Sequence, residues 1–193
     1  MILNMKNLLK YLPRVSLILF FVGCSFFLYY SSPENLIEFI GIENAYLFMF
    51  FLALLGGITT FSGIPYHLVL VTLAAGGLNP GLLGVSSAVG VILGDSTSYF
   101  VGHQGQVIIP QGIQKVLGKI SAFGFKYPRI LPLFFFLYGS FVPFSNDFIV
   151  ISMGLARYPF WRVMLPLGAG NLVFNVSLAF LASYAYDFLQ SIF

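Results

Sequence analysis

Charge is scarce in this sequence. Lysine, arginine, aspartate and glutamate make up only 8% of its 193 residues, whereas 59% are hydrophobic. Soluble domains carry about 25% charged residues, and no polar stretch here is long enough to bury a core of its own. This composition excludes an ordinary soluble protein and predicts an integral membrane protein with one compact membrane domain. The net charge of +3 is spread over short loops, so it gives no sign of nucleic-acid binding.

Cysteine and histidine are also rare. The single cysteine, Cys24, allows no intramolecular disulfide and no multi-cysteine metal site. With only two histidines, no metal motif or nucleophile elbow is present, so we expect no metal, no cofactor and no catalytic residues. The residues before Cys24 resemble a lipoprotein cleavage site, but the apolar run continues beyond it, which favours an uncleaved helix.

Long apolar runs are what the sequence does contain. A membrane-spanning helix needs about 20 apolar residues, and six runs are visible, at 15–30, 45–61, 64–78, 82–102, 130–155 and 161–184. Two stretches are interrupted at a proline, one near Pro65 and one at Pro143. Non-helical backbone at membrane depth is tolerated only where it is buried in protein or lines a wet cavity. A pair of such breaks therefore indicates a transport site.

Basic residues orient the chain by the positive-inside rule. Three of them precede the first run and four lie between 103 and 129: Lys6, Lys10, Arg14, Lys115, Lys119, Lys126 and Arg129. With the N-terminus in the cytoplasm and the acidic segment 31–44 outside, helix 82–102 must cross inward. Segments 45–78 and 130–157 must then each enter and leave on one side, as two re-entrant helical hairpins from opposite faces. This is the geometry of an inverted repeat.

Two features of this topology have simpler alternatives. Pro65 and Pro143 could be helix kinks that neighbouring helices repair. The segment 111–124, which has apolar residues at helical spacing and lysines opposite, predicts a short amphipathic helix on the cytoplasmic surface. A soluble connecting helix is the alternative there.

A glycine-rich segment, 90–102, predicts close helix packing. Gly90, Gly94 and Gly102, with Ser98 between them, recur every four residues and form a smooth stripe. Asp95 and Tyr99 lie on an adjacent face. Ionised Asp95 would be costly in lipid, so it faces protein or water, in either a transport or a purely structural role. Asn171 and Asn175, again four apart, are candidate hydrogen-bond partners.

These residues carry a family resemblance. Gly90, Gly94-Asp95, Tyr99 and Gly102 resemble the glycine–aspartate–tyrosine signature of the DedA family, the bacterial branch of the SNARE-associated Golgi superfamily (VTT-domain proteins). Phe141-Val142-Pro143, with the later Met153-Gly154 and Phe160, is similar to the second hairpin of that family. The order of elements matches as well, over roughly residues 45–184.

The resemblance implies an all-α integral membrane fold. Its parts would be an N-terminal transmembrane helix and external segment (1–44), a DedA-like domain with two opposed hairpins (45–184), and a tail (185–193). It implies a multi-pass protein of the bacterial inner membrane that moves a polyprenyl phosphate or phospholipid between leaflets as a flippase or scramblase. Protons are the implied coupling ion, through the proton motive force. A homodimer is an open alternative to internal packing of the glycine stripe.

The hairpins of this chain depart from the family pattern. The family carries acids on the first hairpin and two arginines on the second, in a pattern like Arg-Phe-x-Pro-x-x-Arg-Thr. Here the first hairpin carries His67, and the second reads Ser140 to Asp147 with both arginine positions neutral. A lipid phosphate would lack its usual cationic partners. If the two tips meet, His67 and Asp147 could pair and relay protons.

The polar residues beside Pro143 have two interpretations. Ser145 and Asn146 could bind a lipid head group, or one of them could cap the following half-helix. Tyr158 and Trp161 are typical of interfacial anchors. The predicted substrate and proton pathway thus comprises Pro65, His67, Asp95, Tyr99, Pro143, Ser145, Asn146 and Asp147.

Two other classes of function stay open from the sequence. A membrane-bound lipid phosphatase or transferase would need a constellation of histidine, aspartate and arginine at the interface, which this sequence does not present. A structural or assembly protein without transport would need neither of the two breaks with ionisable residues. Lipid transport is therefore the leading prediction.

Overall fold

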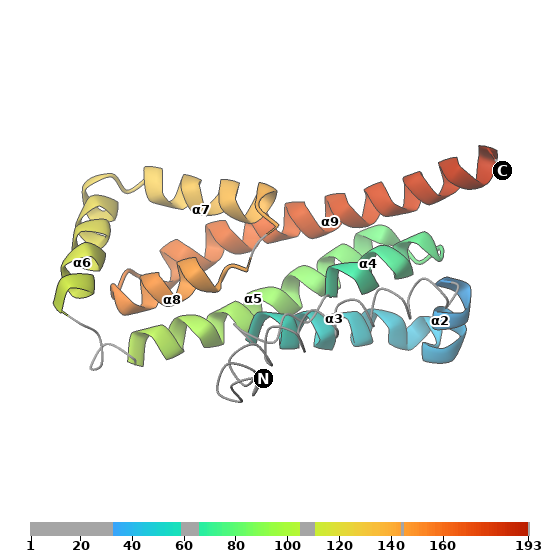
Figure 1. The fold of residues 1–193 in the computed structure, drawn as a ribbon, viewed down its shortest axis with the longest axis horizontal. Coiled ribbons are helices and arrows are strands. Elements are labelled where there is room, and N and C mark those ends of the chain that lie inside the picture. The colour runs from blue at the N-terminus through green and yellow to red at the C-terminus, as the bar shows by residue number, and fades with distance from the viewer. Residues whose placement is uncertain (1–32, 59–65, 105–110, 144, 193) are drawn as a thin grey trace, which may run out of the picture.

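The computed structural model describes residues 33–58, 66–104, 111–143 and 145–192. Within these ranges all of the regular secondary structure is helical, without a β-strand (Figure 1), which confirms the predicted all-α class. The helix expected over 15–30, and with it Cys24, lies outside the described residues. The described helices are α2 (Pro33–Ile40), α3 (Ile42–Ile58), α4 (Tyr66–Ala75), α5 (Pro80–Gln104), α6 (Gln111–Lys126), α7 (Ile130–Phe141), α8 (Asp147–Leu155) and α9 (Phe160–Ile192).

Helices α3, α4 and α5 form a first unit. Helix α3 is described up to Ile58 and α4 from Tyr66; residues 59–65, with Pro65 and the break predicted there, lie outside the described residues. Helix α4 ends in a tight turn in which the backbone N–H of Leu78 donates to the carbonyl of Leu73 at 3.3 Å. Gly77 supplies the positive φ of 89° that this turn requires.

Helices α7, α8 and α9 repeat this arrangement. The chain leaves the helix at Val142 and resumes it at Asp147, and α8 ends in the same kind of turn, with the Tyr158 N–H donating to the Met153 carbonyl at 3.0 Å. Arg157 takes the position of the glycine in the first turn, with a φ of 52°. In both units a helix, a break, a short helix and a turn precede a long helix.

The two units run in opposite directions and exchange their short helices. Helices α3 and α7 begin at opposite ends of the long axis of the molecule, and the chain reverses after each break (Figure 1). Helix α3 packs on α5 and α7 packs on α9, each within its own unit. Helix α4, however, packs mainly on α9, and α8 packs mainly on α5. The starts of both short helices are therefore brought to the interface between the units.

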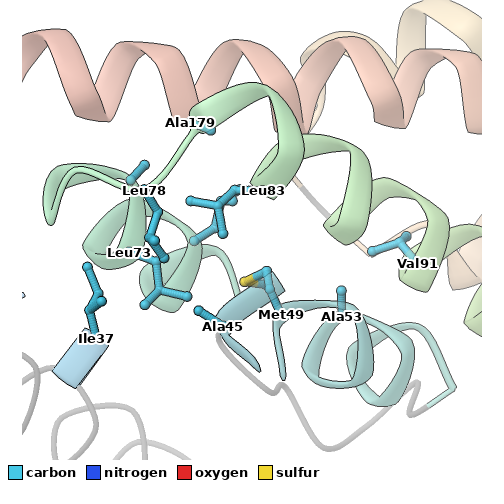
Figure 2. Packing of buried hydrophobic residues seen from close by; sticks show 11 residues of the cluster. Ile37, Ala45, Met49, Ala53, Leu73, Leu78, Leu83, Val91 and Ala179 are labelled. Atoms are coloured by element: carbon cyan, nitrogen blue, oxygen red, sulfur yellow. The ribbon is translucent and has the colours of Figure 1, made fainter. Parts of the chain in front are cut away.

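Each unit contributes an apolar core of its own. The first core joins α2, α3, α4 and the start of α5, with Ala179 of α9 added (Figure 2). The second joins α7, α8 and the start of α9 with Tyr99 of α5. Corresponding positions are buried in both: Met49 and Ala53 of α3 match Phe135 and Gly139 of α7. Polar residues are collected between these two cores.

The exterior of the bundle is strongly apolar. Many large side chains point outward on every long helix, among them Phe141 and Phe148, which are 73% and 79% exposed. The inward face of α5, by contrast, is rich in glycine, serine and alanine. Large apolar side chains therefore cover the outside of the bundle as well as filling its two cores, whereas a soluble bundle turns a mainly polar face to water.

One described helix segment, Phe160–Phe188, is long and apolar enough to cross a membrane by itself. The segments Gly118–Lys126 and Ile130–Phe141, bent by 109°, would add a second if they are counted as one span. Helix α5 covers the predicted crossing segment 82–102 but does not meet this test, because its glycines, serines and Asp95 lower its hydropathy. Helix α9 continues to Ile192, through most of the expected tail at 185–193.

Candidate functional site

A cluster of buried polar side chains joins the two units where α5, α8 and α9 meet. Asp95 of α5 is 2% exposed, Asn146 at the start of α8 is 8% exposed, and Asn171 of α9 is 6% exposed. The amide nitrogen Nδ2 of Asn146 donates to Asp95 Oδ2 at 2.8 Å and to Asn171 Oδ1 at 3.2 Å. Nδ2 of Asn171 donates to the same Asp95 oxygen at 3.4 Å. We call these three residues the central triad.

The position of Asn146 follows from the second break. The helix-forming pattern of α7 ends at Phe141, and Pro143 lies in the non-helical stretch before α8. Asn146 is the N-cap residue of α8, but its side chain makes no capping hydrogen bond. Because α8 crosses onto α5, that side chain instead reaches Asp95. Of the two residues expected to cap the half-helix, Ser145 makes the local bond, accepting the Asp147 N–H at 3.3 Å.

Asp147 adjoins the central triad. It is 2% exposed, and its Oδ2 accepts a hydrogen bond of 2.5 Å from the Ser145 hydroxyl. Its other oxygen, Oδ1, is buried and has no hydrogen-bond partner among the described residues. Asp147 and Asp95 are close enough for their charges to interact. Two carboxylates therefore share one desolvated region.

Asn175 extends the cluster by one turn along α9. Its Nδ2 donates to the backbone carbonyl of Asn171 at 2.8 Å, and its Oδ1 is buried without a hydrogen-bond partner in the described ranges. The phenol of Tyr66, the first residue of α4, reaches the side chain of Asn175 and lies within electrostatic range of Asp95. In the two repeated units, Tyr66 of α4 therefore corresponds to Asn146 of α8. Asn175 of α9 corresponds in the same way to Asp95 of α5.

His67 and Asp147 hold matching positions in the two units, because each lies eleven residues before the residue that closes the following turn, Leu78 or Tyr158. The predicted pair is not formed among the described residues. The His67 ring lies against Tyr66, at a centroid distance of 3.8 Å, and meets the edge of Phe174 of α9 at 5.5 Å. Its neighbours are aromatic, whereas those of Asp147 are polar.

Tyr99 lies outside the cluster, although the sequence groups it with Asp95. Its hydroxyl donates to the backbone carbonyl of Tyr158 at 2.5 Å, so it ties α5 to the turn between α8 and α9. The interpretation of Tyr158 as an interfacial anchor is wrong, because its side chain is 0% exposed. Trp161, two residues after Pro159, is 67% exposed and faces outward.

The glycines of α5 lie at close helix crossings. Gly90 and Gly94 face α3, and a methyl group on Gly94 would lie 2.6 Å from the Cα of Gly57. Gly102 faces the backbone of Ile151 on α8. The stripe therefore contacts two helices of this chain, one from each unit. Ser98, on the same stripe, donates to the Gly57 carbonyl at 3.3 Å.

The charge of this region has one sign. Asp95 and Asp147 are its ionisable acids, and every described lysine and arginine is exposed at the surface. No group of three histidine, cysteine, aspartate or glutamate residues in the described ranges could hold a metal ion. The arrangement is suited to accept hydrogen bonds and positive charge.

The sequence analysis named Asn171 as a candidate hydrogen-bond partner of Asp95, and the structure confirms this bond. It did not predict that Asn146 joins them. Tyr138 was missed as a neighbour of the site, and Tyr66 was not included in the predicted pathway; the Tyr138 hydroxyl donates to the Ser145 carbonyl at 3.2 Å. Tyr66 directly precedes His67 at the first break, and this position in the sequence could have indicated that Tyr66 lies near the site.

Comparison with known proteins adds no relative. No family model matches the chain. No curated protein and no solved structure is significantly similar to it either. The DedA resemblance therefore rests on the signature residues and the order of the elements alone.

Proposed function

We propose that this chain is an integral membrane protein of the DedA type that moves a lipid between the leaflets of the bacterial inner membrane. The observation that carries the proposal is an apolar exterior around a buried polar cluster. Many large apolar side chains are exposed on the outside of the bundle, and its carboxylates and amides are collected between two oppositely directed units. In water such a surface would associate, whereas lipid solvates it.

Two short half-helices support transport in particular. Helices α4 and α8 begin at the interface between the units, and broken helices that meet at an inverted-repeat interface are typical of transporters. In the proposed arrangement α3–α4 and α7–α8 are re-entrant hairpins, and the N-terminus is cytoplasmic. The polar head group of the lipid passes between the hairpins while its acyl chains remain in the bilayer. A purely structural bundle would not need two buried carboxylates there.

Protons are the proposed coupling ion. Asp95 and Asp147 are the ionisable groups at the interface, and a proton on either carboxyl would reduce the repulsion between them. His67, at the matching position of the first unit, is not joined to them through described residues. In this proposal the proton path therefore runs through the carboxylates and not through a histidine–aspartate pair.

A leaflet-exchange assay tests the proposal. The purified protein would be reconstituted into vesicles with a fluorescent phospholipid, and a membrane-impermeant reductant would bleach the outer leaflet. We expect the inner-leaflet label to become accessible faster than in protein-free vesicles, and an imposed proton gradient to change the rate. Asp95→Leu should abolish the exchange, whereas Asp187→Leu, at an exposed position of α9, should not. Exchange no faster than in empty vesicles would overturn the proposal.

A further inference from the structure

The exposed charges of this protein are separated along its long axis. Every lysine and arginine that the structure describes is exposed at the end of the bundle where α6 lies (Figure 1): Lys115, Lys119, Lys126, Arg129, Arg157 and Arg162. The described acids with exposed side chains, Glu38, Glu43 and Asp187, lie at the other end, on α2, at the start of α3 and towards the end of α9. No exposed carboxylate of the described ranges therefore neutralises the basic end.

Helix α6 lies across this end of the bundle. Its segment Gly118–Lys126 is bent by 109° from Ile130–Phe141 of α7, and α7 runs along the long axis together with α9 (Figure 1). Gly124 fixes α6 to the turn between α8 and α9: it lies against the ring of Tyr158, whose hydroxyl donates to the Gly124 carbonyl at 3.5 Å. With α9 crossing the membrane, as proposed above, α6 lies parallel to the membrane surface.

Basic and aromatic side chains alternate where α6 meets the start of α9. The guanidinium of Arg162 lies over the ring of Phe125, 5.8 Å from its centroid. At the end of α6 the ammonium of Lys126 lies 5.4 Å from the centroid of the Tyr127 ring. Phe125 is 56% exposed, and Trp161, beside Arg162, is 67% exposed. We call Phe125, Lys126, Trp161 and Arg162 the basic–aromatic patch.

The chemistry of this patch fits an anionic phospholipid better than a soluble anion. Guanidinium and ammonium groups bind phosphate through charge-assisted hydrogen bonds, and basic residues beside a membrane attract anionic lipids. Tryptophan rings are enriched at the depth of the head groups, where one side of the ring contacts acyl chains. A free phosphate would use only the charges of the patch, whereas an anionic phospholipid would use the charges and the exposed rings.

We infer that the basic–aromatic patch binds anionic phospholipids of the cytoplasmic leaflet, with the lipid phosphate at Arg162 and Lys126 and the acyl chains beside Phe125 and Trp161. These lipids stay at the end of the bundle and are not the cargo that passes between the hairpins. The inference rests on the proposed function for the membrane location and the orientation of the chain, but not for transport. It gives α6 the task of holding the connection between the two units at one leaflet.

Tryptophan fluorescence tests the inference at the patch itself. Trp161 is the only tryptophan of the chain. The protein would be reconstituted into vesicles of phosphatidylglycerol and phosphatidylcholine in equal amounts, with quenching bromine atoms on the acyl chains of one lipid or the other. We expect the anionic lipid to associate beside Trp161 about fivefold more strongly, the effect of one basic residue near a membrane surface. The preference should disappear in about 1 M salt, where the Debye length is about 3 Å. Equal quenching by the two brominated lipids at low salt would overturn the inference.

Variants connect this preference to the patch. Arg162→Gln should reduce it at least about twofold, and Arg162→Gln combined with Lys126→Gln should eliminate it. Arg162→Lys keeps the charge and should keep most of the preference if Arg162→Gln fails to fold. Lys115→Gln is the matched control, because it removes the same charge about 16 Å away along α6, and it should leave the preference unchanged. A preference that survives the double variant contradicts the inference.

Two comparisons separate this inference from its alternatives. Sodium phosphate would be added to the same vesicles, with sodium chloride at equal ionic strength as the reference. A preference abolished by phosphate alone would make a free phosphate the ligand and overturn the lipid assignment. Quenching by neither brominated lipid would contradict the membrane location, on which the proposed function also depends. An anionic preference in a protein that exchanges no lipid would overturn the proposed transport and leave this inference intact.

Discussion

Close approach of α3 and α5 at Gly94 gives the most direct test of this architecture. A methyl group on Gly94 would lie 2.6 Å from the Cα and the carbonyl carbon of Gly57, and 2.6 Å from the carbonyl oxygen of Leu54. Non-bonded carbon atoms prefer about 3.5–4.0 Å, so the two helices would have to separate by about 1 Å in Gly94→Ala. All three neighbours are backbone atoms, which cannot rotate away.

The expected magnitude follows from two opposing effects. Overpacking costs about 1–3 kcal/mol, and the better helix propensity of alanine returns about 1 kcal/mol. Because backbone must move, the cost lies in the upper part of its range, and we expect a net loss of about 1–2 kcal/mol in the free energy of unfolding. For a chain of this size the melting temperature should fall by about 2–8 °C.

Gly118 provides the matched control. It lies in the exposed helix α6, and a methyl group added there would meet nothing within 4 Å. Gly118→Ala should therefore raise the free energy of unfolding, by up to about 1 kcal/mol. Both variants would be melted in the same detergent and followed by circular dichroism. If Gly94→Ala is as stable as Gly118→Ala, α3 and α5 do not cross at this glycine and the packing argument is refuted.

Three further substitutions test other parts of the structure. Arg157→Gly should raise the free energy of unfolding by about 1 kcal/mol, because arginine is disfavoured at a φ of 52°; an unchanged melting temperature would contradict the turn geometry. Tyr99→Phe should lower it by about 1 kcal/mol through the lost hydrogen bond, whereas Tyr184→Phe, 68% exposed, should melt like the parent protein. A double-mutant cycle of Asn146→Ala with Asp95→Ala should give a coupling energy of about 1–3 kcal/mol, and a value near zero would show that the two side chains do not interact.

Local features of this protein could be predicted because they depend on neighbouring residues. Pro143, with Ser145 and Asn146 beside it, predicts the break between α7 and α8, and the structure has it there. The spacing of Gly90, Gly94 and Gly102 predicts a face that allows close approach. Spacing does not identify the partner, however, and these glycines meet two different helices.

Long-range packing decides the rest of the candidate site. The bond between Asn146 and Asp95 exists because α8 crosses onto α5 and not onto α7, and no local pattern determines that crossing. Tyr158 was misjudged for a related reason. Beside Arg157 and Trp161 it looks like a membrane-interface residue, yet it matches Leu78 of the first unit, and hydrophobic residues at that position of the turn pack inward.

The exchange of α4 and α8 between the units has a consequence for how the chain assembles. Each half has an apolar core that is mostly its own, but its short helix packs mainly on the long helix of the other half, so neither half alone can bury that face of its short helix. A polypeptide ending after α5 would offer α4 to a second copy of itself, and two such copies in opposite orientations would reproduce the whole bundle as an antiparallel homodimer. The present chain has the form of such a dimer joined covalently through α6. Co-expressed halves severed in the α5–α6 connection should therefore recombine, whereas either half alone should self-associate or be degraded.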